Sequence, residues 1–211
     1  MTDKPIIFSA PMVRALLEGR KTQTRRVLSS QPKPLPEGML CKWHIPGKHV
    51  GFNMTDEQMH RLGPQFARYA PGDRLYVREA FSYEALDVDR NGFMPPWYWA
   101  DGNPVSGDFT RPKPSIHMPR WASRLTLTVT EVRVERLQDI SAADSIAEGV
   151  QCATCEAMKA SACHGRGCFA SIDAYRTLWN SLHGPDAWDA NPWVVALTFT
   201  VQYGNIDQVK S

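Results

Sequence analysis

The spacing of apolar residues along the chain predicts three β-strands. Residues 125–136 give the clearest pattern, with an apolar side chain at every second position as far as Val129. Val132 continues the pattern in the opposite phase, and a one-residue slip of this kind indicates a β-bulge or a sharp bend. A second strand is expected over 193–203, and a short third strand begins near Leu75.

Helical periodicity, with apolar residues three and four positions apart, appears in three segments. The first helix follows a serine that can serve as its N-cap and ends near Gly19. The second starts after Ser141, has Asp144 placed for a capping box and stops at Gly149. The third covers 171–182. Bent strands with helices between them favour an α+β fold, built as a small bent barrel with flanking helices.

Two long stretches, about 28–70 and 85–119, are rich in Pro, Gly and polar residues and show weak periodicity. Structureless loops of this length are unusual inside a compact domain. Both are therefore predicted to be insertions into a single domain that spans 1–211.

The composition is that of an ordinary globular protein: of 211 residues, 43% are hydrophobic and 22% are charged. Seven Trp, eight Phe and six Tyr need burial, which excludes disorder as the dominant state. No run of apolar residues approaches the roughly 18 that a membrane span requires, and the N-terminal residues lack the apolar core of a secretory signal. We therefore expect a cytoplasmic protein with no membrane partner; protein partners are not indicated.

The net charge of +2 hides an uneven distribution. Residues 1–130 carry 18 basic and 12 acidic side chains, whereas residues 131–211 carry 6 basic and 10 acidic ones. The densest basic cluster consists of Arg14, Arg20, Lys21, Arg25 and Arg26. Such a cluster can neutralise a phosphate backbone, although a solvated helix end is the simpler interpretation of a charge run alone.

Four of the five cysteines fall within a knuckle at about 150–170: Cys152, Cys155, Cys163 and Cys168. In a reducing compartment this grouping favours a metal over disulfides, and four thiolates suffice for a closed tetrahedral zinc site. We expect a structural Zn there, with reduced, unligated thiols as the alternative, and no organic cofactor.

Four segments occur in an order that resembles a known family. Residues 19–26 read G-R-K-T-x-T-x-R, and residues 69–79 read Y-x-P-G-D-x-L-x-V-R-E. With the segments 114–141 and 178–199, they resemble the ASCH domain family, in particular its longer members from bacteriophages and prophages. The resemblance covers essentially the whole chain, and it implies a PUA-like β-barrel.

The resemblance also implies a role in recognising RNA or modified bases. In a small bacterial branch of the family, the enzyme removes an acyl group from the exocyclic amine of acetylated cytidine. Its site uses a Lys and a Thr of the first motif and a Glu on a later helix, which correspond here to Lys21, Thr24 and Glu148. Other members are linked to ribonuclease activity.

These residue types suit amide hydrolysis, which needs a nucleophile, a base and an acid for the leaving amine. Thr24 can attack the carbonyl if Lys21 takes its proton, and this requires burial or cationic neighbours to lower the Lys21 pKa. Glu148 can pass the proton to the departing amine. Residues 21 and 24 of an extended strand would point to opposite faces, so a turn after Gly19 is expected to bring them together.

Two other functions stay open. In a non-catalytic module that binds RNA, or less readily DNA, Lys21 would contact a phosphate and Thr24 would cap a turn. A ribonuclease is the third possibility. Glu79 is expected to form an ion pair with Arg78 or another motif arginine. The residues expected to contact nucleic acid or substrate are Arg20, Arg25, Arg26, Arg78, Trp97 and Trp99.

Overall fold

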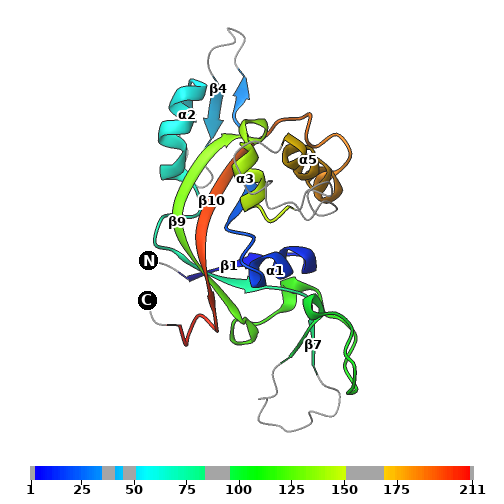
Figure 1. The fold of residues 1–211 in the computed structure, drawn as a ribbon. Helices are drawn as coiled ribbons and strands as arrows, with labels where there is room; N and C mark the ends of the chain where they lie inside the picture. Colours follow the sequence, from blue (N-terminus) through cyan, green and yellow to red (C-terminus); the bar gives the residue numbers. More distant parts are fainter. Residues whose placement is uncertain (1–2, 35–40, 45–50, 84–95, 151–168, 210–211) are drawn as a thin grey trace. The chain divides into compact units, whose positions relative to one another are not determined.

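The computed structural model describes residues 3–34, 41–44, 51–83, 96–150 and 169–209 (Figure 1). The helices are α1 (Ala10–Leu17), α2 (Asp56–Leu62), α3 (Ala142–Ala147) and α5 (Phe169–His183). The strands are β1 (Asp3–Ile7), β2 (Gln23–Val27), β3 (Lys33–Pro34), β4 (Cys41–His44), β5 (Gly51–Met54), β6 (Arg74–Arg78), β7 (Phe81–Ser82), β8 (Trp97–Tyr98), β9 (Leu125–Arg136) and β10 (Trp193–Tyr203).

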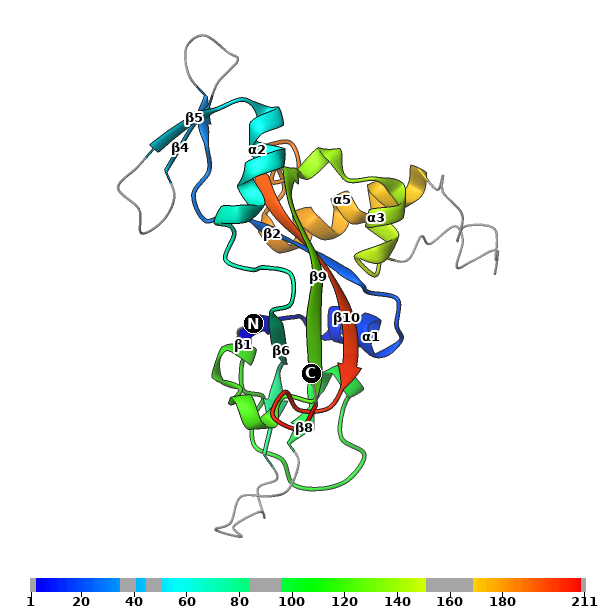
Figure 2. The same ribbon diagram turned by 90° about the vertical axis from the view of Figure 1, so that its left-hand side faces the viewer.

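Five of the strands form one sheet in the order β1-β6-β9-β10-β2, and the long strands β9 and β10 lie side by side in it (Figures 1 and 2). The chain is therefore a mixed α+β protein, as its sequence predicts. Among the described residues the sheet is open, because its outer strands β1 and β2 are not paired with each other. A closed PUA-like barrel stays a prediction.

The chain divides into two compact units, each assembled from separate stretches of sequence. Unit 1 comprises Met1–Arg20, Gly72–Val129 and Phe199–Ser211; unit 2 comprises Lys21–Pro71 and Thr130–Thr198. Both β9 and β10 contribute residues to each unit. The expected single domain over the whole chain stays a prediction.

In unit 1, β1 runs parallel to β6, and β6 runs antiparallel to β9 with Leu75 opposite Leu127. The side chains of Leu75, Val77 and Leu127 are buried. Helix α1 adds Val13 and Leu16 to the buried side chains. Its expected boundaries are confirmed, since Ser9 is the N-cap residue by its backbone conformation and Gly19 follows the helix with φ +71°. The Ser9 side chain makes no capping hydrogen bond.

In unit 2, β2 pairs antiparallel with the first half of β10, with Thr24 opposite Leu197 and Arg25 opposite Ala196. Helices α3 and α5 pack against each other. One hydrophobic cluster of this unit consists of Leu137, Ile140, Tyr175, Trp179, Trp188 and Val194. The expected apolar stripe of α5 is thus found at Tyr175 and Trp179, whereas Leu182 at its end is exposed.

The phase slip in β9 is confirmed by burial. The side chains of Leu125, Leu127 and Val129 are buried, Thr130 and Glu131 are both exposed, and Val132 is buried again. The two consecutive exposed residues shift the buried positions by one. The division between unit 1 and unit 2 falls at this point, between Val129 and Thr130.

The expectation of irregular structure over 28–70 is wrong for part of that stretch. It contains the three-stranded sheet β3-β4-β5 and helix α2. Thr55 caps α2 in a full capping box, in which its side chain accepts from the Gln58 N–H and the Gln58 side chain accepts from the Thr55 N–H. In the second stretch, the described part from 96 to 119 holds only β8 and short turns of 3₁₀ helix.

Gly63, which follows α2, lies close to β9. A Cβ atom at this position would come within 2.9 Å of the Val134 Cβ, too close for two carbon atoms without a backbone shift. Gly63→Ala is therefore expected to lower the free energy of unfolding by about 1–3 kcal/mol in urea denaturation. Arg61→Ala, at an exposed position of α2, serves as a control and should change it by less than about 0.5 kcal/mol. Equal stability of the two variants would contradict this close packing.

None of the helices in the described part of the chain has the length and apolar character that crossing a bilayer requires.

Candidate active site

The residues just before β2 lie against the C-terminal end of α3. The Thr22 N–H donates to the Ala147 carbonyl at 2.8 Å, and Lys21 forms an isolated antiparallel bridge with Glu148. This backbone pairing places Lys21 and Glu148 side by side, although 127 positions separate them in the sequence. All residues of this arrangement belong to unit 2.

The position of Glu148 is fixed by both ends of α3. At the start, the Ser141 side chain accepts a hydrogen bond from the Asp144 N–H at 3.0 Å. At the end, Glu148 is the C-cap residue, and Gly149 adopts φ +86°, a conformation that ends the helix. The predicted helix and its boundaries are confirmed. Glu148 therefore stands at a helix end whose carbonyl groups have no partner within the helix.

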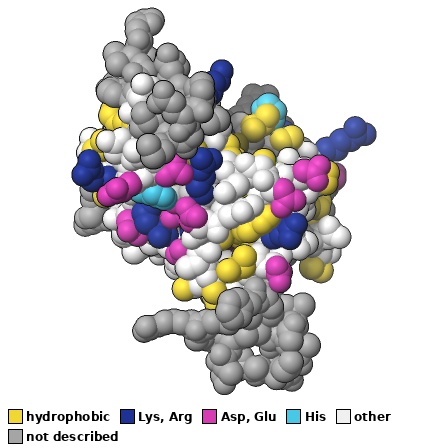
Figure 3. All heavy atoms as spheres, turned by 90° about the horizontal axis from the view of Figure 1, so that it is seen from above, with side chains coloured by type: hydrophobic (Ala, Val, Ile, Leu, Met, Phe, Trp, Pro, Cys, Tyr) yellow, Lys and Arg dark blue, Asp and Glu magenta, His cyan; other side chains and the backbone are white. Residues whose placement is uncertain are grey.

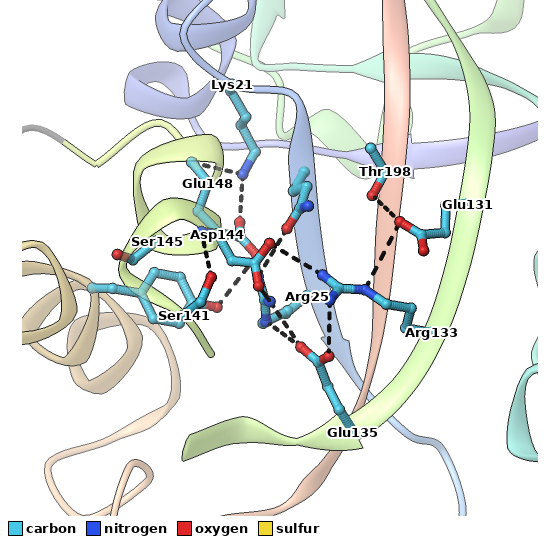
Figure 4. Close-up of polar contacts among 12 residues, drawn as sticks. Lys21, Arg25, Glu131, Arg133, Glu135, Ser141, Asp144, Ser145, Glu148 and Thr198 are labelled. Carbon is cyan, nitrogen blue, oxygen red and sulfur yellow. Dashed lines mark hydrogen bonds and ion pairs between the residues drawn. The ribbon is translucent and has the colours of Figure 1, made fainter. Parts of the chain in front are cut away.

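Lys21 and Glu148 form a buried ion pair (Figure 4). The Lys21 Nζ donates to the Glu148 Oε2 at 2.7 Å and to the Glu148 backbone carbonyl at 2.8 Å. Lys21 is 1% exposed and Glu148 3%. Burial is the largest effect on the Lys21 amine and holds its pKa below the ordinary value of 10.5, even though Glu148 acts in the opposite direction. Arg26 and Arg25 lower the pKa further.

The second carboxylate oxygen of Glu148 faces other residues. The Arg25 Nη1 lies 3.3 Å from Oε1, and the Tyr175 hydroxyl, on α5, lies 3.5 Å from the same oxygen. Burial and the neighbouring Glu148 raise the pKa of Tyr175 well above its usual range, so its hydroxyl keeps the proton that it donates. The two oxygens of Glu148 thus have separate partners, Lys21 on one side and Arg25 with Tyr175 on the other.

Arg25 is held by carboxylates from two further positions (Figure 4). Its Nε and Nη2 lie 3.0 and 2.7 Å from the Glu135 Oε1, and its Nη2 lies 3.3 Å from the Asp144 Oδ2. The Arg25 side chain has no exposed surface. Burial disfavours its charge, but Glu148 and Glu135 outweigh burial and raise the Arg25 pKa. Contact between Arg25 and a substrate phosphate would require these bonds to break.

Thr24 is buried, with 4% of its surface exposed. Alternation along β2 places its side chain on the opposite face from Gln23 and Arg25. Among the described residues, no hydrogen bond joins its hydroxyl to Lys21 or Glu148. The structure therefore shows a direct hydrogen bond between two of the three predicted catalytic residues, Lys21 and Glu148.

Arg26 is partly buried and lies within electrostatic range of this site. Burial lowers its pKa, whereas Tyr69, Glu148 and Tyr175 act to raise it. Tyr69 and Arg26 come from the two sequence motifs, and these two residues interact electrostatically within unit 2.

The other predicted binding residues belong to unit 1, where each contacts residues of that unit. Arg20 pairs with Glu18, Arg78 donates to the Ile116 carbonyl, the Trp97 indole donates to the Gly102 carbonyl, and the Trp99 indole donates to the Ser82 hydroxyl. A role for Arg20, Arg78, Trp97 and Trp99 in binding stays a prediction.

Glu79 forms an ion pair as expected, but its partner is Arg124, whereas Arg78 donates to the Ile116 carbonyl. Arg124 binds both carboxylate oxygens of Glu79, at 2.9 and 3.0 Å, and also pairs with Asp101. The same guanidinium lies over the Tyr98 ring, 4.0 Å from its centre. This arrangement gives Glu79 a structural contact within unit 1.

The predicted zinc ligands Cys152, Cys155, Cys163 and Cys168 lie outside the described residues, so the zinc site stays a prediction. Among the residues that the structure does describe, no group of three or more His, Cys, Asp or Glu side chains is arranged to hold a metal ion.

Sequence reasoning did not identify Glu135, Asp144 and Tyr175 as part of this site. Asp144 is recognisable in the sequence only as a helix-capping residue. Glu135 gives a detectable signal, because it is a carboxylate in a strand with alternating apolar residues, and a buried carboxylate needs a partner. Tyr175 reads as a core residue of an amphipathic helix, and only the packing of α5 brings its hydroxyl to Glu148.

The face of the molecule shown in Figure 3 carries charges of both signs. On the face shown in Figure 3, Lys and Arg side chains are interspersed with Asp and Glu. The described residues of this face therefore do not form a continuous basic surface of the kind that binds nucleic acid through its phosphates.

Comparison of the chain with protein-family models, with curated proteins and with solved structures found no match.

Proposed function

We propose that this protein hydrolyses the amide of an acylated cytidine, as a free nucleoside or within RNA, on an ASCH-type, PUA-like scaffold. The observation that carries the proposal is the buried Lys21–Glu148 pair, in which an amine and a carboxylate meet at 2.7 Å. Removing two charges from water costs free energy, and a catalytic use would explain why this pair is buried. A perturbed pKa such as that of Lys21 is also common at active sites. The first motif, with Lys21 and Thr24, supplies the remaining support.

In the proposed reaction, the Thr24 hydroxyl attacks the acyl carbonyl and gives its proton to the neutral Lys21 amine. A C–O bond forms between Thr24 and the acyl carbon, and the bond between the acyl carbon and the exocyclic N4 of the cytosine breaks. The departing amine takes up a proton through Glu148, because the 2.7 Å contact allows a proton to pass between the Lys21 Nζ and the Glu148 Oε2. Water then hydrolyses the acyl ester on Thr24.

The low pKa of Lys21 matters for the first step. An amine with an ordinary pKa of 10.5 is almost entirely protonated at neutral pH and cannot accept a proton. Burial lowers this pKa, which increases the fraction of neutral amine. Since Lys21, Thr24 and Glu148 are all nearly inaccessible in this conformation, a substrate has to displace neighbouring groups to reach them.

The test is incubation of the purified protein with N4-acetylcytidine, with N4-acyl variants and with an acetylated RNA oligonucleotide digested to nucleosides afterwards, followed by chromatography for deacylated cytidine. Wild-type protein is expected to release cytidine, and Lys21→Met is expected to release none. Lys113→Met removes an exposed lysine of unit 1 and should retain wild-type turnover. Absence of turnover on every substrate would overturn the proposal.

A non-catalytic RNA-binding module is the second candidate, and one observation favours it. Lys21, Thr24 and Glu148 are buried, and two donated hydrogen bonds join Lys21 to Glu148, as in a purely structural ion pair. In that case RNA would bind without being altered, and Thr24→Ala would leave its affinity unchanged. Labelled RNA that is cut with or without a divalent metal would instead indicate a ribonuclease.

A further inference from the structure

Arg25 occupies the centre of a cluster of three carboxylates, in which Glu135 and Glu148 are buried and Asp144 is half-buried. The carboxylates come from β9, from α3 and from the C-cap of α3, and Figure 4 shows them converging on the guanidinium. A guanidinium can serve several acceptors at once, because its five N–H groups point in fixed directions. Arg25 lies within the first motif, where the sequence predicts a contact with nucleic acid or substrate and not a bond to Glu148.

The hydrogen bonds of Arg25 differ in length and in which nitrogen donates them. Its Nε and Nη2 go to one oxygen of Glu135, at 3.0 and 2.7 Å, and these short bonds fix the plane of the guanidinium. Its Nη1 then lies 3.3 Å from the Glu148 Oε1 and 3.4 Å from the Gln23 side-chain oxygen. The plane set by Glu135 therefore determines where Arg25 meets Glu148.

Glu148 is in turn held between two cations. Its Oε1 faces Arg25 and its Oε2 faces Lys21, so the carboxylate cannot turn toward one partner without weakening the other contact. Arg25 also competes with Lys21 for the same negative charge. When Arg25 attracts the Glu148 carboxylate, less of the negative charge of Glu148 is available to stabilise the Lys21 ammonium.

We propose that Arg25 is a positioning residue, which fixes the orientation of the Glu148 carboxylate and favours the neutral form of the Lys21 amine. The catalytic part of this inference rests on the proposed function. The coupling between Arg25 and Lys21 can be measured without any substrate. Besides Glu148 and Arg25, the groups that act on Lys21 include Arg26, and Tyr175 on α5 faces Glu148.

The measurement is a pH titration of the Lys21 Cε signal by NMR, in protein labelled with ¹³C at the Cε of lysine. The signal is assigned by its loss in Lys21→Met. In the double variant Arg25→Gln/Glu135→Gln, a cation and an anion are removed together, so that the buried charge stays balanced. The midpoint of Lys21 is expected to rise by about one pH unit in this variant. It should rise less in Arg25→Lys, which keeps the charge but not the guanidinium plane.

Arg133→Gln is the matched control. Arg133 contacts two of the same carboxylates, Asp144 at 3.2 Å and Glu135 at 3.6 Å, but its described contacts do not include Glu148. It should leave the midpoint of Lys21 unchanged. An unchanged midpoint in both Arg25 variants, or an equal rise in Arg133→Gln, would overturn the inference. If the double variant does not fold, Arg25→Lys decides the question alone.

Turnover separates this inference from the proposed function. If the wild type hydrolyses acylated cytidine, Arg25→Lys is expected to lower kcat about tenfold and to leave KM within about twofold, because orientation acts on the chemical step. If the wild type shows no turnover, the hydrolase proposal fails, and the Lys21 midpoint still shows whether Arg25 positions the pair.

Discussion

Glu148→Gln is expected to lower the free energy of unfolding by about 3–5 kcal/mol and to abolish turnover. The substitution keeps the shape of the side chain but removes the charge that faces both Lys21 and Arg25, and both cations are then left buried without this partner. Lys21→Met should cost less, because Glu148 keeps its contacts with Arg25 and Tyr175. Both variants should lack hydrolytic activity.

Urea denaturation of a double-mutant cycle measures this effect. The variant with both Lys21→Met and Glu148→Gln should be more stable than the sum of the single effects predicts, by about 0.5–3 kcal/mol, since the two residues interact directly. Glu131→Gln is the control: this carboxylate is 57% exposed on β9, and its loss should change stability by less than about 0.5 kcal/mol. If Glu148→Gln were no more harmful than Glu131→Gln, the pair would not be buried in solution.

Thr24→Val is expected to lower turnover at least about 10³-fold while leaving the protein as stable as the wild type. Valine has nearly the same shape as threonine, and among the described residues the Thr24 hydroxyl has no hydrogen bond to lose. Thr24→Ser, which keeps the hydroxyl, should retain measurable activity. Rates of cytidine release and urea denaturation curves, measured on the same preparations, separate the two effects.

Thr22→Val is the matched control for Thr24, because Thr22 belongs to the same motif but is exposed. It should keep wild-type turnover. If Thr24→Val retains activity, the attacking group is a water molecule and not the threonine hydroxyl. The Lys21–Glu148 pair would then act on that water, and the role of Thr24 would have to be revised.

The parts of the fold that were predicted well are those in which one side-chain pattern dominates. The strand over Leu125–Arg136 was predicted with its observed bounds. Its apolar residues alternate clearly both before and after the phase slip, and this alternation is typical of a β-strand. Helix α3 was predicted from its ends, Ser141 and Gly149, since caps depend on local backbone geometry.

Helix α2 and the sheet β3-β4-β5 were missed because their segments are short and rich in turn-forming residues. The signal for α2 was present: Thr55 and Gln58 have the spacing of a capping box. Each strand of that sheet has four residues or fewer. Such short segments, flanked by Pro and Gly, do not show a recognisable alternation of apolar and polar residues. Their pairing is decided by contacts between strands.

The site was predicted in part for a similar reason. The resemblance to a family supplied Lys21 and Glu148, and the structure shows that they meet. It did not supply Arg25 as a partner of Glu148, because the basic cluster around it reads as a solvent-exposed surface. The burial and pairing of the Arg25 guanidinium depend on Glu135 and Asp144, which are distant in sequence and contact it only in the folded chain.

The bond from the Lys21 Nζ to the Glu148 carbonyl has a consequence for folding. That carbonyl is at the end of α3, so the lysine completes the helix as well as the ion pair. An eight-residue segment from Ser141 to Glu148 is too short to be a stable helix alone. Its last turn thus becomes stable only when a strand from near the start of the chain has docked, across a loop of 127 positions. In newly made or refolding chains, the last turn of α3 and the candidate site should therefore form together, when the segment around Lys21 docks.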